Sequence, residues 1–514
     1  MLLALSEHIR EIDIYSSEVL GIPLLDLMNR SGRAVERVLR ENVKLGSRVV
    51  ILAGSGNNGG DGYALAAGIL DDYDCTVYDI FSCGQKTKEG RYYHDEYILR
   101  RGKVKKFGFS ESELEEIKNA DCIVDAVFGT GFVGEMPDKL DLLIAAVNSS
   151  TRAYKIAIDV PLGVNADDGS ISPAYACSVN VTVALSFIKP GLVSYPARSF
   201  VGHIVYDDID LPLSELVKNF KFRFNYIDAP LAASLLPKRP ENSNKGTFGK
   251  LLILAGSSKY RGAAHLALEA ALRGGVGLVT YSGVSALSDE LASKFPEAIY
   301  VSREEDEPAP QDIEKLAELS HQHTAILIGS GSSVSDGLYN TVFRLLSMDG
   351  SPVILDADAI NAMSDRREEA LAMLSSSKRA VVLTPHPLEF ARLFGTDVAS
   401  VQSRRIEMAL SFAKEYNCIL VLKGAGTIVT DGDRVFINST GSSALSKAGS
   451  GDVLAGLIAS VTASGVDPIS AAALSVYFHG LAADSLKNEL SVFGVTPSDL
   501  PKEIAKQIGK VHQS

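Results

Sequence analysis

The chain has 514 residues, more than one hydrophobic core usually takes, so we expect two or three domains. Its apolar content of 46% excludes a disordered chain. A net charge of -13 argues against a general nucleic-acid surface, which needs clustered Lys and Arg, but it is compatible with a local phosphate site.

The first half of the chain alternates predicted strands and helices. Helical stretches such as 61–70 and 139–148 separate short, β-branched apolar runs. The runs that predict strands are 48–54, 75–81, 121–129, 154–161 and 179–187. Because these strands are apolar on both faces and alternate with helices, the pattern predicts a parallel sheet covered on both sides, in an α/β fold.

A glycine-rich loop follows the first of these strands. Residues 53–64 read AGSGNNGGDGYA, and five of the twelve are glycine. Glycine lets a ligand approach the main chain, and free N–H groups at a helix start favour an anion. The loop has neither a GxGxxG in register nor the lysine of a P-loop. A plain tight turn remains the structural alternative.

Two carboxylates stand at later strand ends of the same half. Asp125 belongs to DCIVDAVFGTGFVGE and Asp159 ends KIAIDVP. Each could simply cap a helix. Ligands of open parallel sheets bind at the carboxyl ends of the strands, however, so the glycine-rich loop and the two aspartates together predict a cleft.

The strand–helix rhythm breaks over 207–245, where prolines and charges accumulate. We place a domain boundary near residue 220, with domains at 1–218 and 219–514. A helical section is expected from Asp452 onward. Before it, strands are predicted at 249–257, 324–331, 352–359, 379–386 and 418–426. The second domain is therefore also predicted to be α/β.

The stretch SKAGSGDVLAG at 446–456 predicts a second site. Gly449 and Gly451 precede Asp452 and an apolar helix. Main-chain N–H groups at such a helix start can stabilise a developing negative charge. Asp452 can then accept the proton of a substrate hydroxyl while a phosphoryl group arrives. The structural alternative is a glycine turn with Asp452 as a helix cap.

The motifs of the first half resemble a known family. NNGGDG, DAVFGTGFVGE and DVPLG, in this order, resemble the NAD(P)H-hydrate epimerase domain over most of 1–215. The resemblance implies a Rossmann-like, parallel three-layer sandwich that interconverts R and S hydrates. It also implies a potassium ion on Asn58 and Asp125. The family usually has Ser where this chain has Leu162, so Leu162 would contribute its main chain at most.

The same resemblance names the residues expected at the epimerase site. Asp159 is the implied acid–base catalyst. The implied substrate-binding residues are Asn57, Asn58, Gly59, Gly60, Asp61, Gly129, Thr130, Gly131, Phe132, Val133, Gly134, Glu135 and Asp159.

The second half resembles the ADP- or ATP-dependent NAD(P)H-hydrate dehydratases of the ribokinase-like superfamily over about 225–510. The motifs are NKGTFGKLLILAGS, DADAINAM, LTPHPLEFARL, LKGAGTIVTDG and TGSSALSKAGSGDVLAG. The implied reaction phosphorylates the hydrate hydroxyl and then eliminates phosphate, with Mg²⁺ as the charge carrier. Asp452 is the implied catalytic base. The family leans toward ADP as donor and toward a homo-oligomer, a tetramer or larger.

This second resemblance also implies contacts. Those with the nucleotide are Lys423, Gly424, Ala425, Gly426, Thr427 and Gly451. Those with the hydrate are Ala255, Gly331, His386 and Asp452; without the family match, His386 in its TPHP turn could be purely structural. Two segments depart from the family: a GPG-like loop reads IGSGSS at 328–333, and a TGN reads TGSS at 440–443. We expect altered nucleotide affinity from the second.

The cysteines bear on the compartment. They are five in number and have no CxxC spacing, which indicates reduced thiols: Cys75, Cys83, Cys122, Cys177 and Cys418. The first residues contain too short an apolar run for a signal peptide, and no run reaches the roughly 18 apolar residues of a membrane helix. We therefore expect a cytoplasmic protein that binds neither membranes nor nucleic acid.

Three alternatives stay open on the sequence. A ribokinase-like vitamin or sugar kinase fused to a Rossmann-like domain would keep Asp452 but change the acceptor. A non-catalytic binding module in 1–215 is favoured by Leu162. A purely structural protein explains neither NNGGDG nor GSGD.

Overall fold

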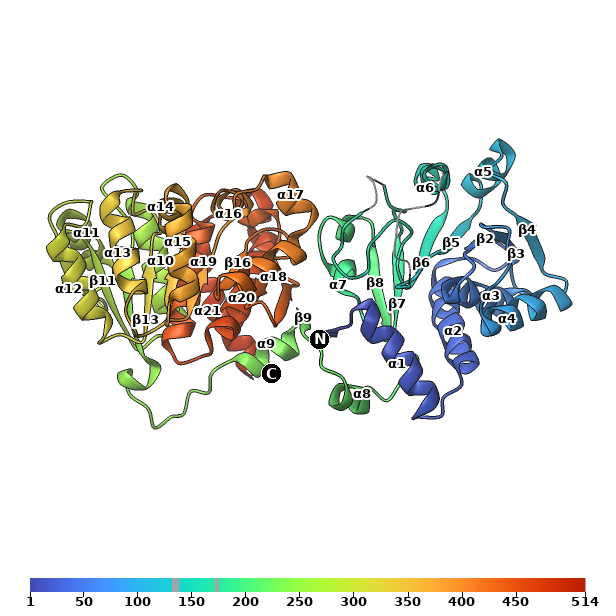
Figure 1. Cartoon of the computed structure of the whole chain (residues 1–514), viewed down its shortest axis with the longest axis horizontal. Coiled ribbons are helices and arrows are strands. Elements are labelled where there is room, and N and C mark those ends of the chain that lie inside the picture. The colour runs from blue at the N-terminus through green and yellow to red at the C-terminus, as the bar shows by residue number, and fades with distance from the viewer. Residues whose placement is uncertain (132–136, 138, 172–174, 514) are drawn as a thin grey trace. The chain divides into compact units, whose positions relative to one another are not determined.

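The structure, a computed structural model, describes residues 1–131, 137, 139–171 and 175–513. The chain forms two compact units (Figure 1). The N-terminal unit is Leu2–Phe224, and the C-terminal unit is Asn225–Ser514 together with Met1. The division falls in the stretch where the strand–helix rhythm of the sequence breaks.

The N-terminal unit contains a sheet of seven strands, in the order β4-β3-β2-β5-β6-β7-β8. All neighbouring strands in it are parallel. The strands are β2 (Arg48–Ala53), β3 (Asp74–Asp79), β4 (Lys103–Lys106), β5 (Cys122–Ala126), β6 (Tyr154–Ile158), β7 (Val181–Leu185) and β8 (His203–Asp207). The five predicted strands are confirmed, and the two edge strands β4 and β8 are additional.

Helices cover both faces of this sheet. Val49 and Ile51 of β2 join one core, and Val50 and Leu52 join the other, so alternate residues of one strand serve two layers of helices. The helices are α1 (Ser6–Glu18), α2 (Leu24–Asn42), α3 (Asn57–Ile69), α4 (Lys88–Leu99), α5 (Glu111–Lys118), α6 (Leu140–Ser149), α7 (Pro190–Val193) and α8 (Leu213–Asn219). The predicted three-layer sandwich is confirmed.

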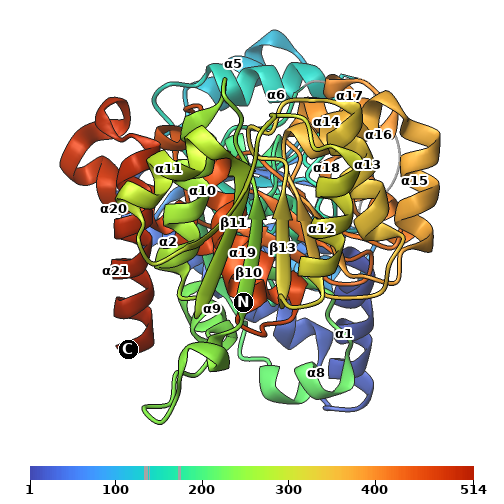
Figure 2. The ribbon, with the colours of Figure 1, turned by 90° about the vertical axis from the view of Figure 1, so that its left-hand side faces the viewer.

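The sheet of the C-terminal unit runs in the order β9-β18-β17-β16-β15-β14-β13-β10-β11-β12. The strands are β9 (Phe224–Ile227), β10 (Lys250–Leu254), β11 (Leu278–Val284), β12 (Ile299–Arg303), β13 (Ala325–Ile328), β14 (Val353–Leu355), β15 (Val381–Leu383), β16 (Ile419–Leu422), β17 (Ile428–Thr430) and β18 (Val435–Asn438). Neighbouring strands are parallel from β16 through β15, β14, β13, β10 and β11 to β12. β17 is antiparallel to both of its neighbours, β16 and β18. Figure 2 shows β11, β10 and β13 side by side.

All five strands predicted for this unit are present but end three or four residues before their predicted ends, and β9, β11, β12, β17 and β18 were not predicted. The expected strand 418–426 ends at Leu422, and the chain turns back into β17. Gly424 and Gly426 lie in the turn with φ of 138° and 60°, a region that glycine enters without steric cost. The glycines that made this motif look like a nucleotide loop therefore also close a hairpin.

Many helices flank this second sheet: α9 (Ala229–Leu235), α10 (Arg261–Gly274), α11 (Ser285–Lys294), α12 (Pro310–Ser320), α13 (Asp336–Leu346), α14 (Asp358–Asp365), α15 (Arg367–Ser376), α16 (Pro387–Phe394), α17 (Val398–Ser403), α18 (Arg405–Glu415), α19 (Ser450–Ala463), α20 (Pro468–Gly494) and α21 (Leu500–Gln513). The predicted C-terminal helical section starts at Ser450, two residues before Asp452. α19 packs closely on α10, because an added Cβ on Gly456 would lie 2.2 Å from the Ala267 carbonyl oxygen. Within the described residues, no helix is long and apolar enough to cross a membrane.

Candidate active sites

A cavity of about 550 Å³ lies at the carboxyl ends of β2, β5, β6 and β7 in the N-terminal unit. Seven of the predicted residues line it: Asn57, Asn58, Asp61, Gly129, Thr130, Gly131 and Asp159. The predicted residues 132–135 lie outside the described part of the chain. The cleft expected from three separate strand ends is thus a single hollow.

The remaining glycines of the first loop support its shape. An added Cβ on Gly59 would lie 1.9 Å from the Gly54 carbonyl oxygen, and one on Gly60 would lie 2.5 Å from the end of Met28. A Cβ on Gly54 would in turn meet the Val127 carbonyl oxygen at 1.9 Å. Gly59 and Gly60 therefore pack against protein, and they let the loops after β2 and β5 approach each other.

Asn58 and Asp125 offer oxygen atoms from adjacent strand ends. Asn58 is buried, and neither atom of its amide group has a hydrogen-bond partner among the described residues. Asp125 is also buried and accepts hydrogen bonds from the N–H groups of Val127 (3.2 Å) and Leu162 (2.6 Å). Burial raises the pKa of Asp125 to about 6. Amide and carboxylate oxygens are the ligands a hard cation prefers, and the unpartnered Asn58 amide together with the buried Asp125 carboxylate supplies both kinds.

Leu162 contributes to this region through its main chain. Its side chain is fully buried among apolar residues. Its N–H donates to Asp125, and its carbonyl accepts a hydrogen bond from the Cys177 N–H at 2.8 Å. A carbonyl oxygen has a second lone pair, so this group can still bind a ligand.

Asp159 is held by a buried cation. Its backbone adopts φ of 65°, and its carboxylate accepts from the Leu185 N–H at 3.3 Å. The Nζ of Lys189, whose side chain is 1% exposed, forms an ion pair with Asp159 and donates to the Leu185 carbonyl at 2.8 Å. Sequence reasoning missed Lys189, which lies in SFIKPGL without a recognisable motif.

Two further acids face the same lysine. Burial raises the pKa of Asp13, on α1, to about 6, with Lys189 opposing the rise. Burial and the charges of Asp159 and Asp13 raise the pKa of Asp61 well above its usual range. A protonated carboxyl group and a carboxylate can therefore be present in one cavity near neutral pH, which is what proton transfer in both directions requires.

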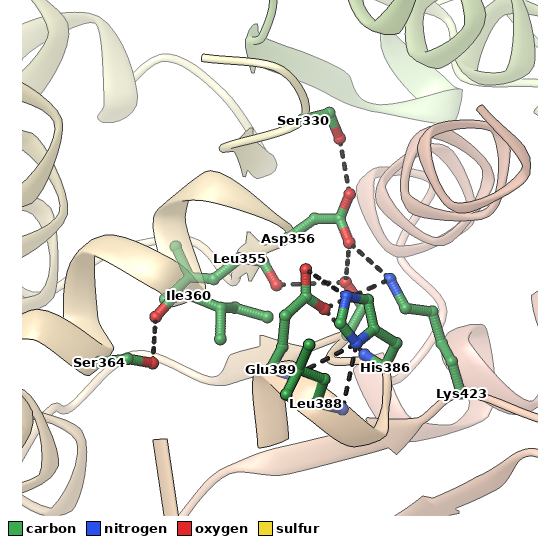
Figure 3. A network of polar contacts seen from close by, with 10 residues as sticks. Ser330, Leu355, Asp356, Ile360, Ser364, His386, Leu388, Glu389 and Lys423 are labelled. Carbon is green, nitrogen blue, oxygen red and sulfur yellow. Dashed lines mark hydrogen bonds and ion pairs between the residues drawn. The ribbon is translucent and has the colours of Figure 1, made fainter. Parts of the chain in front are cut away.

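In the C-terminal unit, polar groups meet at the ends of β13 to β16. Asp356 is 1% exposed and accepts three hydrogen bonds: from Ser330 Oγ (2.9 Å), Thr384 Oγ1 (2.7 Å) and Lys423 Nζ (3.1 Å). Figure 3 shows the side chains of Ser330 and Lys423 pointing toward its carboxylate. Asp356 lies within the DADAINAM motif, but neither it nor Ser330 was predicted to be a site residue.

His386 caps the start of α16 and so has a structural role. Its Nδ1 accepts hydrogen bonds from the main-chain N–H groups of Leu388 and Glu389, both at 3.2 Å. Its main-chain N–H donates in turn to the Glu389 carboxylate at 2.8 Å. Burial lowers the pKa of His386. The buried Glu389, which was not predicted, lies 4.0 Å from Lys423 Nζ. His386 thus caps a helix beside the Lys423 network, and its other ring nitrogen is 3.3 Å from Glu389 (Figure 3).

Lys423 joins this network to the start of α19. Although burial opposes it, the charges of Asp356 and Glu389 raise the pKa of Lys423, so the amine stays protonated. An added Cβ on Gly451 would lie 3.4 Å from Lys423 Nζ. Burial and the charge of Asp356 raise the pKa of Asp452 to about 7. Lys423, Gly451 and Asp452, predicted from two distant motifs, therefore meet.

The other predicted residues of this unit lie on neighbouring loops. Gly256 N–H donates to the Ser330 carbonyl at 2.8 Å and so joins the loops that carry Ala255 and Gly331. In the β16–β17 turn, Thr427 Oγ1 donates to the Gly424 carbonyl at 2.9 Å.

His479 on α20 is a further residue that sequence reasoning missed. Burial lowers its pKa to about 4, and its Nε2 atom has no partner among the described residues. It lies beside the backbone of Ser450, the first residue of α19. A neutral imidazole therefore stands behind the helix start that carries Gly451 and Asp452.

Comparisons with known proteins agree over both units. Residues 251–506 match the family model of NAD(P)H-hydrate dehydratase, and residues 24–191 match that of the YjeF-related protein N-terminus. The chain is 34% identical to a bifunctional NAD(P)H-hydrate repair enzyme of Moorella thermoacetica, covering 97% of this chain and 95% of the relative. It is 30% identical to the Escherichia coli enzyme of that description, covering 96% and 92%.

Solved structures match the C-terminal unit. The ADP/ATP-dependent NAD(P)H-hydrate dehydratase from Bacillus subtilis, co-crystallised with ATP and Mg²⁺, is 30% identical with a TM-score of 0.49, covering 56% of this chain and 98% of that chain. A ribokinase-like superfamily protein from Enterococcus faecalis is 24% identical with a TM-score of 0.50, covering 57% and 99%. The latter likeness concerns the fold alone, which is the predicted ribokinase-like one.

Proposed function

The chain belongs to the bifunctional NAD(P)H-hydrate repair enzymes, and we propose that its two sites receive the same hydrated coenzyme in succession. The N-terminal unit epimerises the R and S hydrates of NADH and NADPH. The C-terminal unit dehydrates the S hydrate at the expense of a nucleotide. The observation that carries this assignment is that each site combines glycine main chain with an acid whose pKa is raised toward neutrality, Asp13 in one and Asp452 in the other.

In the epimerase site, a potassium ion would be held by Asn58, Asp125 and the Leu162 carbonyl. The unpartnered amide of Asn58 and the buried carboxylate of Asp125 fit a hard cation, which would neutralise the substrate phosphates when bound. Asp159 is the acid–base group, and Lys189 holds its carboxylate in place. The loops at Asn57–Asp61 and Gly129–Gly131 would hold the substrate, as would the predicted residues 132–135.

In the dehydratase site, Lys423, the turn 424–427 and Gly451 would contact ADP or ATP, bound with Mg²⁺; Ala255, Gly331 and His386 would hold the hydrate. Asp452 accepts the proton of the hydrate hydroxyl. The hydroxyl oxygen forms a bond to the terminal phosphorus as the bond from that phosphorus to the rest of the nucleotide breaks. Phosphate then leaves with the C–O electron pair, and loss of a proton from the neighbouring carbon forms the ring double bond. The B. subtilis relative, crystallised with ATP and Mg²⁺, supports this nucleotide assignment.

Hydrate turnover by the full chain tests the dehydratase assignment. Recovery of NADH absorbance from the S hydrate would be followed with ADP and with ATP, on wild type and on Asp452→Asn. We expect the variant to fold and to bind nucleotide, and its turnover to fall by at least about 10²-fold, the contribution of a general base. Normal turnover by the variant would remove Asp452 from this role.

The R hydrate tests the epimerase assignment in the same full-length protein. Wild type with nucleotide and potassium should consume both hydrates. Asp159→Asn should consume the S hydrate at the wild-type rate and leave the R hydrate to its spontaneous conversion. If the variant consumes the R hydrate as fast as wild type does, the N-terminal unit is a binding module and not an epimerase.

The family resemblance also supports a cytoplasmic homo-oligomer, a tetramer or larger. The five cysteines of the chain are free thiols, in keeping with a reducing compartment. Light scattering on the purified chain would give the mass of the assembly, and a monomer at micromolar concentration would refute this part of the proposal.

A further inference from the structure

One face of helix α1 lines the cavity of the epimerase site. Ile9, Arg10 and Asp13 are the residues of this helix that border it. Asp13 follows Arg10 by three positions and Ile9 by four, so the three residues lie on the same side of the helix. The start of the helix is fixed to the segment between β6 and β7, where the Ser6 N–H and hydroxyl donate to Asp167 at 2.7 and 2.9 Å. A fixed element therefore holds Arg10 at the cavity.

Arg10 is a cation without a partner in the described part of the chain. It is exposed, and among the described residues it forms no hydrogen bond or ion pair. The other basic residue among the described ones that line the cavity is Lys189, which is buried and paired with Asp159. Of these lining residues, only Arg10 therefore offers a positive charge that a ligand can use. A guanidinium group binds phosphate through two parallel N–H donors, which makes arginine well suited to that anion.

The cavity needs such a charge to receive a dinucleotide. The acids among its described lining residues outnumber the bases, and they are Asp13, Asp61, Glu89 and Asp159. The substrate brings further negative charge on each phosphate of its pyrophosphate. Like charges at short range raise the energy of a complex, and a cation on the cavity wall offsets them. The potassium ion proposed for this site would supply part of the balance, and Arg10 supplies a part that belongs to the chain itself.

A second feature that favours anions borders the same cavity. Helix α3 starts there, and Ser55, Gly56 and Asn57 line the wall. The Gly60 N–H donates to the Gly56 carbonyl at 3.1 Å as the helix begins, so the N–H groups before Gly60 are left for a ligand. An added Cβ on Gly56 would meet no atom within 4 Å, so the space beside this helix start is open. Arg10 and the start of α3 can therefore contact one dinucleotide.

We propose that Arg10 binds a phosphate group of the hydrated dinucleotide in the epimerase site. This inference rests on the proposed epimerase function and adds a substrate contact that the sequence motifs do not contain. The phosphate belongs either to the pyrophosphate, which the hydrates of NADH and NADPH both carry, or to the ribose phosphate, which only the NADPH hydrate carries. Arg10 acts in binding and not in proton transfer, because a guanidinium group stays protonated in proteins.

Interconversion of the hydrates by the full chain tests this contact. Without nucleotide the dehydratase does not turn over, so conversion of a purified S hydrate to the R form can be followed by chromatography with potassium present. Arg10→Gln removes the charge, and KM should rise by about 10- to 100-fold, the loss expected for a charge-assisted hydrogen bond. The contact is the same before and during the reaction, so kcat should change by less than about threefold. Arg10→Lys keeps the charge but not the planar fork, and its KM should be intermediate.

The two coenzyme hydrates identify which phosphate is bound. An equal rise in KM for the NADH and NADPH hydrates assigns Arg10 to the pyrophosphate. A rise confined to the NADPH hydrate assigns it to the ribose phosphate. Either result supports the proposal, because the chemistry of the contact is the same.

Arg33→Gln is the matched control for the loss of charge. Arg33 on α2 is also exposed and forms no hydrogen bond or ion pair among the described residues, but it does not line the cavity. The variant loses the same charge from the same unit, so KM for both coenzyme hydrates should stay as in wild type. Since both arginines are exposed, Arg10→Gln and Arg33→Gln should unfold at the wild-type temperature.

The outcomes separate the contact from the function on which it rests. If wild type does not interconvert the R and S hydrates, the proposed epimerase function itself fails. If wild type is active but Arg10→Gln keeps the wild-type KM for both coenzyme hydrates, Arg10 binds no phosphate and the inference is wrong. An equal rise of KM in Arg33→Gln would also overturn it, because the effect would then come from the overall charge of the unit. Should Arg10→Gln fail to fold, Arg10→Ala takes its place, since alanine is the best helix former for an exposed position.

Discussion

Replacing Lys189 with methionine should leave a buried carboxylate without its cation. The Lys189 side chain is 1% exposed, and among the described residues its amine donates hydrogen bonds to Asp159 and to the Leu185 carbonyl. Methionine keeps the volume of the lysine stem but cannot neutralise charge. Removing one partner of a buried ion pair costs about 3–5 kcal/mol. We therefore expect Lys189→Met to lower the stability of the N-terminal unit by that amount at neutral pH.

The second partner supplies the control for this prediction. Asp159→Asn alone leaves the ammonium group buried and unpaired, whereas Lys189→Met with Asp159→Asn removes both charges. Replacing both members of a buried pair is often nearly neutral, so the double variant should be more stable than either single one. A positive coupling energy on this scale identifies the ion pair as the cause.

Hydrogen exchange of the full chain is the suitable assay, since the two units can unfold separately. Peptides covering β6 and β7 report the opening of the N-terminal sheet alone. The reasoning is refuted if Lys189→Met lowers the opening free energy by less than about 1 kcal/mol, or if the effects of the single variants simply add in the double variant.

Three further predictions concern the same unit. Burial raises the pKa of Asp13 from 3.8 to about 6, so between these pH values the folded unit holds a proton that the unfolded chain has lost. The stability that this group contributes therefore falls as pH rises from about 4 to about 6. Asp13→Asn should flatten that fall when unfolding temperatures are measured across this pH range. Potassium should raise the unfolding temperature of the unit more than lithium does at equal ionic strength, and Asn58→Ala should abolish the difference; an unchanged potassium effect would place the ion elsewhere. Gly59→Ala should destabilise by about 1–3 kcal/mol, since its Cβ would lie 1.9 Å from a carbonyl oxygen, whereas Gly56→Ala, with no atom within 4 Å, should stay within about 0.5 kcal/mol.

In the N-terminal sheet, the strands buried on both faces were predicted from the sequence, and the edge strands β4 and β8 were not; in the C-terminal sheet, the buried strands β11, β17 and β18 were also missed. The run RVVILA of β2 is apolar at every position but the first, and alternate side chains enter two cores. The edge strand β4 reads KVKK and is mostly exposed. Because three of its four residues are charged, a search for apolar runs does not find it. The hairpin of β16 and β17 was missed because its turn glycines were taken for a ligand loop alone.

The same distinction holds for the sites. Asp159 follows the end of a strand and Asp452 follows a glycine motif, and both of these local signals can be recognised in the sequence alone. Asp13 lies on an amphipathic helix whose spacing does not reveal that one position faces a cavity. Lys189 is identified only by the carboxylate it meets, 30 residues away in sequence. Sequence reasoning finds the groups that loops present, whereas the groups that set their charge come from elsewhere in the fold.

Two of the departures from the family pattern lie beside buried aspartates, Asp125 and Asp356, and they differ in physical consequence. At position 162 the leucine side chain is buried in the core, and the N–H that contacts Asp125 belongs to the main chain, so the substitution removes a hydroxyl but keeps this support. In the loop 328–333, the serine at 330 instead adds a buried hydroxyl that donates to Asp356 at 2.9 Å. The first change therefore bears on how tightly a cation is held, and the second on how Asp356 is held beside Lys423. Leu162→Ser should accordingly change potassium affinity and leave dehydration of the S hydrate unchanged, whereas Ser330→Ala should change dehydration and leave potassium affinity unchanged.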